Sequence, residues 1–236
     1  MMKRTLAVGL IILLPLVSCT SRNEVFDEAI SRARGTSQAV VNPVGDGLPY
    51  FTTGTLNPTW EEKGQFPIVQ FPDVEWRDQL GTLHRKEYFE NRNTIVAFFF
   101  STCTGFCPMM VQKLKRMEKE LRGVPNLQFV AISVDPEVDT PARLEVYAKA
   151  QGVRPQTSFK FFTSSQSVLD RIVHETFATQ VVARKNSSLR SFAHSEHFYL
   201  LDQQGRLRGV LNGSRIDAPQ DARKMLVALA EGKPSS

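Results

Sequence analysis

The feature that most constrains the fold is the apolar run at residues 94–100, which leads into two closely spaced cysteines and a proline. The run is rich in β-branched and aromatic side chains, so it predicts a strand buried on both faces of a sheet. Pro108 then stands where a helix can begin, at its N1 position. Apolar side chains follow at helical spacing, at Met110, Leu114, Met117 and Leu121. The sequence therefore predicts a strand-to-helix corner around residues 101–107.

Strand and helix signals alternate along the rest of the chain. A buried strand is expected at residues 127–133 and a further strand at residues 159–162. A hairpin is expected from residues 198–201 and 207–211, with Gly205 near its turn. Helices are expected to begin at the cap formed by Asp139, Thr140 and Pro141, at Ser164 or Ser165, and at Ala218. The second of these helices is expected to end at Phe177 and the third at Ala230.

This order of elements predicts an α/β fold, a thioredoxin-like sandwich. Residues 74–77 and 81–84 flank a turn signal, and they predict an added N-terminal β-hairpin in front of the sandwich.

The N-terminus has the layout of an export signal. Lys3 and Arg4 precede an apolar run at residues 6–14, which is short for a transmembrane helix. Residues 16–19, Leu-Val-Ser-Cys, resemble the bacterial lipobox, in which the cysteine becomes the lipidated first residue of the mature protein. We therefore expect residues 1–18 to be a lipoprotein signal peptide and Cys19 to carry lipid, with a simple export signal as the alternative. Either reading places the mature protein outside the cytoplasm, and lipidation would anchor it to a membrane surface on the periplasmic side.

Composition divides the remaining chain into a spacer and one domain. Residues 19–65 are rich in small polar residues, glycine and proline, and are expected to form a linker with a short helix at residues 24–34. The C-terminal end of this linker is expected to begin packing on the domain. Residues 66–232 are expected to form the folded domain. The formal net charge of +5 is scattered along the chain, so we expect no nucleic-acid partner.

Cys103 and Cys107 form the chemical centre of the predicted corner. A helix N-terminus stabilises thiolates, and a spacing of four residues lets both sulfurs point the same way. Two thiolates suit a soft metal, above all Cu(I), and an added imidazole would make Cu(II) tolerable as well. A structural disulfide and a redox-active dithiol remain open readings of the same pair.

A third ligand has several candidates. His194 ends a polar loop and precedes a predicted strand, so it can reach the corner in a thioredoxin-like fold, whereas His197 would face the opposite side of that strand. Asp135 follows a buried strand and is a candidate acid, although Asp before Pro is also ordinary turn chemistry. Residues with weaker claims are His84, His174, Met109 and Met110 as ligands, and Arg184, Lys185 and Arg190 as a basic docking loop.

At these residues the chain resembles the SCO/SenC family of copper chaperones, which are associated with cytochrome c oxidase assembly. The matching stretches are residues 99–108 with the Cys-x-x-x-Cys-Pro corner, residues 133–140, and His194-Ser195 followed by Tyr199-Leu200. Residues 48–51 and 58–60 also look like a segment of some bacterial members, so the resemblance covers about residues 48–230.

The resemblance implies a thioredoxin fold with one copper ion held by Cys103, Cys107 and His194. It further implies that the chain delivers copper to the binuclear copper centre of cytochrome c oxidase, or reduces the cysteines of that centre. Another copper chaperone or a thioredoxin-like reductant would be a second partner. One departure is Ala193, because the family usually has an acidic residue just before the histidine, where a carboxylate could orient the imidazole.

Three functions therefore compete at this point. A metallochaperone explains the wide cysteine spacing together with His194. A thiol-disulfide oxidoreductase explains the corner alone. A copper or redox sensor would use the basic loop to dock on a partner.

Overall fold

The computed structural model describes residues 48–53, 56–60, 67–155, 157–172 and 196–231. The predictions for the signal peptide, for Cys19, for the helix at residues 24–34, for His174, for the basic loop and for His194 lie outside these residues. The chain divides into two compact units at residue 38, and everything described below belongs to the second unit.

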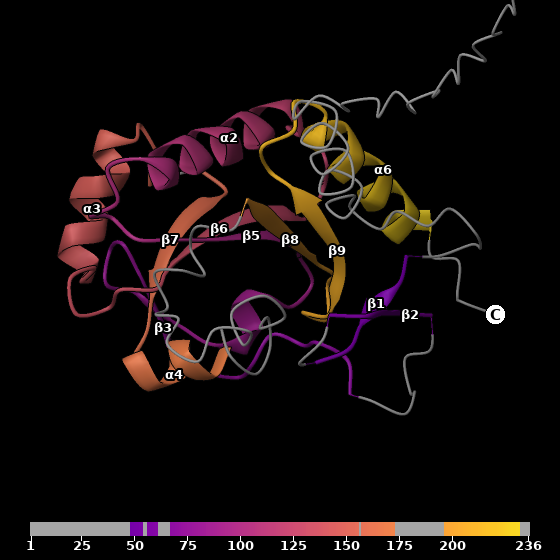
Figure 1. Ribbon diagram of the computed structural model, residues 1–236, viewed down its shortest axis with the longest axis horizontal. Coiled ribbons are helices and arrows are strands. Elements are labelled where there is room, and N and C mark those ends of the chain that lie inside the picture. The colour runs from indigo at the N-terminus through magenta and orange to yellow at the C-terminus, as the bar shows by residue number, and fades with distance from the viewer. Residues whose placement is uncertain (1–47, 54–55, 61–66, 156, 173–195, 232–236) are drawn as a thin grey trace, which may run out of the picture. The chain divides into compact units, whose positions relative to one another are not determined.

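A mixed sheet of seven strands, in the order β4-β3-β7-β6-β5-β8-β9, forms the centre of the fold (Figure 1). The strands are β3 Trp76–Asp78, β4 Leu83–His84, β5 Asn93–Phe99, β6 Leu127–Ser133, β7 Phe159–Thr163, β8 His197–Leu201 and β9 Leu207–Asn212. Strands β5, β6 and β7 run parallel to one another, while β8 is antiparallel to β5 and β9 to β8. The thioredoxin-like fold class predicted from the sequence is confirmed, with the β3–β4 pair as the added N-terminal hairpin.

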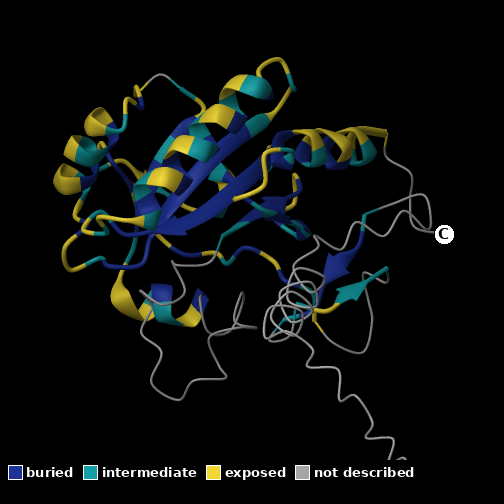
Figure 2. Ribbon diagram, turned by 45° about the horizontal axis from the view of Figure 1, so that its top comes forward, coloured by how far each residue is buried: buried dark blue, intermediate teal, exposed yellow. Residues whose placement is uncertain are grey.

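Burial explains why the central strands read as continuous apolar runs. Every residue of β5 is buried, and so is every residue of β6 after Leu127. A strand with neighbours on both edges and side chains covered on both faces has no polar face to show. Figure 2 shows this buried sheet between helices whose outer faces are exposed.

Within the described ranges, the α-helices are α2 Phe106–Glu120, α3 Pro141–Ala150, α4 Gln166–Arg171 and α6 Ala218–Glu231. In Figure 1, α2 and α6 lie along one side of the sheet, while α3 packs against β7. In the described ranges, no helix is both long enough and apolar enough to cross a membrane.

Two helix boundaries differ from the sequence prediction. Helix α2 begins at Phe106, two residues before the predicted start at Pro108. A proline in the first helical turn is tolerated because the N–H groups of that turn need no partner inside the helix. The described part of α4 ends at Arg171, and the predicted continuation to Phe177 lies outside the described residues.

The end of the predicted linker packs on the sheet edge. Strands β1 Tyr50–Phe51 and β2 Pro58–Thr59 form a small hairpin, and Arg208 of β9 donates to the carbonyls of Leu48 and Pro49 at 2.6 and 3.2 Å. The Arg208 guanidinium also lies 4.1 Å from the centre of the Tyr50 ring. The folded region thus includes residues well before residue 66.

Candidate metal-binding site

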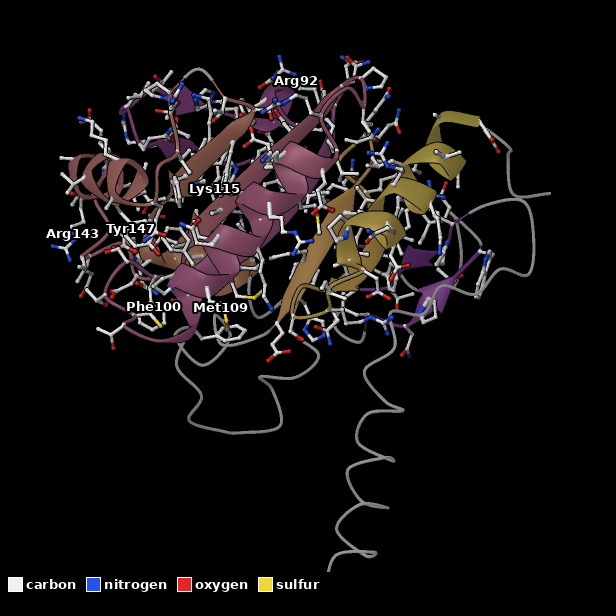
Figure 3. All side chains as sticks on the ribbon, turned by 90° about the horizontal axis from the view of Figure 1, so that it is seen from above. Arg92, Phe100, Met109, Lys115, Arg143 and Tyr147 are labelled. Carbon is white, nitrogen blue, oxygen red and sulfur yellow. The ribbon has the colours of Figure 1, made fainter. Side chains whose placement is uncertain are left out.

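The two cysteines lie at the corner between the end of β5 and the start of α2. Cys103 is in the connecting loop and partly exposed, and Cys107 is in the first turn of α2 and 1% exposed. Both are free thiols, and the backbone N–H of Cys107 donates to the sulfur of Cys103 at 3.4 Å. In Figure 3 the labels of Phe100 and Met109, which flank the corner in sequence, mark its place at the N-terminal end of α2. The structure brings Cys103 and Cys107 together at this corner.

The exposed thiol is the more acidic of the two. Partial burial by itself raises the pKa of Cys103, but hydrogen bonds to its sulfur from the backbone N–H groups of Cys107 and Gly105 outweigh that effect and lower it below the ordinary value. Unpaired N–H groups at a helix start favour a negative charge in this way. Cys103 is therefore the sulfur that first becomes available as a thiolate.

The inner thiol is held in its neutral form. The pKa of Cys107 is raised to about 12, mainly by burial. Negative charge on Cys103 and Asp139 contributes to this rise, and a backbone hydrogen bond at Phe100 opposes it. A soft cation between the two sulfurs would reverse this balance, since a bound metal favours the thiolate form of its ligands.

A buried carboxylate, that of Asp139, forms hydrogen bonds with the loop that carries the cysteines. Asp139 is 0% exposed and accepts hydrogen bonds from the backbone N–H of Ser101 at 2.9 Å, from the Ser101 hydroxyl and from the Ser133 hydroxyl. Ser101 precedes Cys103 by two residues, and Ser133 ends β6. Asp139 thus ties the loop that carries the cysteines to the neighbouring strand.

Asp139 does not cap α3, although the sequence predicted it as part of the cap. Thr140 is the N-cap of α3, where its hydroxyl accepts from the N–H of Arg143, and Pro141 is the first helical residue. Because the residue directly before an N1 proline occupies the cap, the Asp139 side chain was left without a local partner. An aspartate next to a cap that it does not form was the one sequence feature that could have indicated the buried hydrogen bonds of Asp139.

The other candidate residues have different surroundings. His84 lies 2.9 Å from the carboxylate of Asp78, in the β3–β4 hairpin, and Asp135 is a largely buried residue in the turn after β6. Met109 is 46% exposed, while Met110 is buried in the core as expected for filler. Within the described ranges, no group of three or more His, Cys, Asp or Glu side chains could hold a metal ion.

His194 lies outside the described residues, but the strand that follows it is placed. Strand β8 pairs antiparallel with β5, with Val96 opposite Tyr199, so β8 begins at the end of the sheet where β5 leaves for the cysteine corner. His194 precedes the first residue of β8, His197, by three positions. His197, the first residue of β8, therefore lies at the end of the sheet where β5 ends.

The donor set of the described residues fits copper in part. Two adjacent sulfurs, one partly exposed and one buried, are soft donors of the kind that Cu(I) prefers. Such a pair leaves room for a third donor, which has to come from a residue outside the described set, from a partner or from solvent.

Comparison with known proteins identifies the family. The SCO1/SenC family model matches residues 71–230, which is most of the chain and includes every strand of the main sheet. The chain belongs to the SCO1/SenC family. The SCO1 protein homologue of Bacillus subtilis is 27% identical over 118 residues, which are 49% of this chain and 60% of that protein.

Solved structures share the fold of this SCO1/SenC chain. BsSco, described as a member of the Sco family of cytochrome c oxidase assembly proteins, gives a TM-score of 0.58 at 20% identity and covers 70% of this chain and 95% of its own. Yeast Sco1, solved with copper bound, gives a TM-score of 0.54 at 21% identity and covers 70% of this chain and 94% of its own. The comparison confirms the predicted fold family, and it shows that a relative of this chain binds copper.

Proposed function

We propose that this chain binds one copper ion through the sulfurs of Cys103 and Cys107 and the imidazole of His194, and delivers it to the binuclear copper centre of cytochrome c oxidase. The observation that carries the proposal is the adjacency of the two free sulfurs at the end of β5. The antiparallel pairing of β5 with β8 supports the choice of the histidine, because β8 begins, at His197, at the end of the sheet where β5 ends.

The names of relatives support the choice of metal and partner. Membership in the SCO1/SenC family, the copper-bound structure of yeast Sco1 and the description of BsSco as an oxidase assembly protein all agree with a copper cargo. Ala193 stands before the histidine, so we expect the imidazole to lack an adjacent carboxylate.

Copper would leave by ligand exchange. Thiolates of the partner would displace the imidazole first and then the two sulfurs in turn, so that the ion is never free in solution. The partly exposed Cys103 is accessible to an incoming thiolate, whereas Cys107 is covered by the core. We therefore expect the bond to Cys107 to be the last that breaks.

The unequal thiols also support a second candidate function, the reduction of cysteines in the oxidase centre or in another exported protein. The Cys103 thiolate would attack one sulfur of a partner disulfide, forming a mixed disulfide and releasing the other partner sulfur as a thiolate. Cys107 would then lose its proton and attack the sulfur of Cys103, which releases the second partner sulfur and leaves a disulfide between the two cysteines. A thioredoxin-like reductant would have to restore the dithiol.

We further propose that the mature chain is attached to a membrane on the periplasmic side through a lipid on Cys19. The support is the lipobox-like sequence at residues 16–19 directly after an apolar run. Metabolic labelling with a radioactive fatty acid tests this, since Cys19→Ala should abolish the label.

A titration with Cu(I) tests the main proposal. The reduced wild-type protein should take up one equivalent of Cu(I), and Cys103→Ala and Cys107→Ala should each abolish tight uptake. A reduced wild-type protein that binds no Cu(I) would refute it. Disulfide exchange that survives His194→Ala, with copper uptake absent in the wild type, would establish the reductase function instead.

A further inference from the structure

The hydroxyl of Tyr147 is buried and has no hydrogen-bond partner among the described residues. Tyr147 of α3 is packed with its ring stacked on Phe99 at 5.3 Å between centres and edge-on to Phe161 at 5.6 Å. A phenol that is placed by two aromatic contacts and has no partner is unusual, since buried hydroxyls are normally hydrogen-bonded.

The surroundings of Tyr147 belong to the cysteine corner. Phe99 is the last residue of β5, and Arg143, one helical turn before Tyr147, donates to the Ser101 hydroxyl at 3.3 Å. Residues four apart on a helix share a face, so Tyr147 faces the same end of the sheet as Arg143. Figure 3 shows both residues on α3, on the side of the molecule where α2 begins.

The charged groups that act on the Tyr147 phenol belong to the cysteine corner. Burial raises the pKa of Tyr147, and negative charge on Cys107, Cys103 and Asp139, in that order, raises it further. The phenol therefore stays protonated, so it is a hydrogen-bond donor that faces a cluster of potential anions. The carboxylate of Asp139 already accepts from Ser101 and Ser133.

The Cys107 sulfur changes its hydrogen-bonding capacity with its state. A neutral thiol is a weak acceptor, which explains why a nearby phenol gains little from it in the metal-free protein. A thiolate bound to a metal keeps negative charge on sulfur and is a much stronger acceptor. A hydrogen bond to that thiolate would satisfy the Tyr147 hydroxyl, which has no partner among the described residues.

We propose that Tyr147 is a positioning residue for copper, and that its hydroxyl donates a hydrogen bond to the sulfur of Cys107 when that sulfur carries the charge of a bound thiolate. The proposal rests on the copper-binding function above. The hydrogen bond fixes the side-chain rotamer of Cys107 and offsets the cost of holding a charged sulfur in the core. It adds a side-chain donor to the inner sulfur, which has one backbone hydrogen bond at Phe100, whereas Cys103 accepts from the backbone N–H groups of Cys107, Gly105 and Phe106.

Tyr147→Phe removes the hydroxyl and leaves the ring packing in place. We expect metal-free Tyr147→Phe to be at least as stable to urea as the wild type, because a buried hydroxyl without a partner is lost. We expect its affinity for Cu(I), measured by competition with a coloured chelator, to fall about 10- to 100-fold, as for the loss of a hydrogen bond to a charged group. Tyr88→Phe is the matched control, since the ring of Tyr88 packs on Phe162 and its electrostatic neighbours are Arg92 and Asp78.

A spectroscopic signature separates positioning from packing. Addition of Cu(I) should shift the ultraviolet absorbance of tyrosine in the wild type and in Tyr88→Phe, and the shift should be missing in Tyr147→Phe. Equal Cu(I) affinity of the wild type and Tyr147→Phe, or an unchanged tyrosine shift in that variant, would overturn the proposal. Failure of the wild type itself to bind Cu(I) would refute the proposed function, which is a different result.

Discussion

The carboxylate under the cysteine corner gives the sharpest prediction for stability. Asp139 is fully buried and accepts three hydrogen bonds, two from Ser101 and one from Ser133. Asp139→Asn keeps the shape of the side chain but removes the charge and replaces one acceptor oxygen with a donor amide. The amide then points at groups that had been donating to the carboxylate.

The magnitude follows from the number and type of these bonds. A hydrogen bond to a charged group contributes about 1.5–3 kcal/mol, and bonds in one network do not add fully. Two hydroxyl donors can turn, so part of the network recovers, and we expect a loss of about 3 kcal/mol in the free energy of unfolding. For a domain of this size, that corresponds to a melting temperature lower by about 6–12 °C.

The same substitution should change the chemistry of the inner thiol. Burial is the main reason for the raised pKa of Cys107, and the negative charge of Asp139 adds to it. Removing that charge makes the thiolate less unfavourable, so the pKa of Cys107 should fall. In a Cys103→Ser background, the rate of Cys107 alkylation should therefore rise at a lower pH in Asp139→Asn than in the parent.

Urea unfolding of the reduced, metal-free protein measures the first effect, and the alkylation series measures the second. Asp217→Asn is the control, because Asp217 forms an exposed ion pair with Arg215 and its loss should change neither quantity noticeably. Full retention of stability in Asp139→Asn would refute the argument that this carboxylate ties the corner to β6.

Three further predictions concern stability alone. Burial lowers the pKa of His197 below its ordinary 6.5, and the charge of Glu196 opposes this effect, so the neutral imidazole stabilises the fold fully above pH 6.5 and this contribution is lost as the pH falls below 6.5. His197→Gln should therefore flatten the decline of the free energy of unfolding in urea below pH 6.5, and an unchanged slope would contradict this. Lys160→Met removes the ammonium group that lies 2.6 Å from the buried carboxylate of Asp78, so it should lower the free energy of unfolding in urea by about 2–3 kcal/mol. An unchanged free energy of unfolding would contradict this. Gly213→Ala would put a methyl group 2.6 Å from the terminal carbon of Met110 and 2.7 Å from the ring of Phe198, so a cost of about 1–3 kcal/mol is expected by calorimetry. Equal stability would show that these two side chains can move aside.

Local patterns were sufficient to predict the fold. The buried runs of β5 and β6, the Thr140-Pro141 start of α3 and the β8–β9 hairpin around Gly205 are each determined by neighbours in sequence. Gly205, with a φ of +73°, occupies a turn conformation that favours glycine, which is why its position marked the hairpin. Helix α2 begins earlier than predicted because a first-turn proline does not fix which of several positions it occupies.

The site could be predicted only where its chemistry is local. Cys103 and Cys107 are four residues apart, so their pairing was visible in the sequence. Tyr147 and Asp139 reach the corner from a different connection of the sheet, and only the parallel pairing of β5 with β6 brings them there. A long-range contact of this kind leaves no periodic signal, so the supporting residues had to come from the structure.

The most direct test of the central claim is X-ray absorption spectroscopy of the Cu(I)-loaded protein beside its His194→Ala variant. The account predicts two sulfur scatterers and one nitrogen scatterer in the wild type, and loss of the nitrogen with both sulfurs retained in the variant. Identical spectra for the two proteins, or a wild-type ion with fewer than two sulfur neighbours, would contradict it.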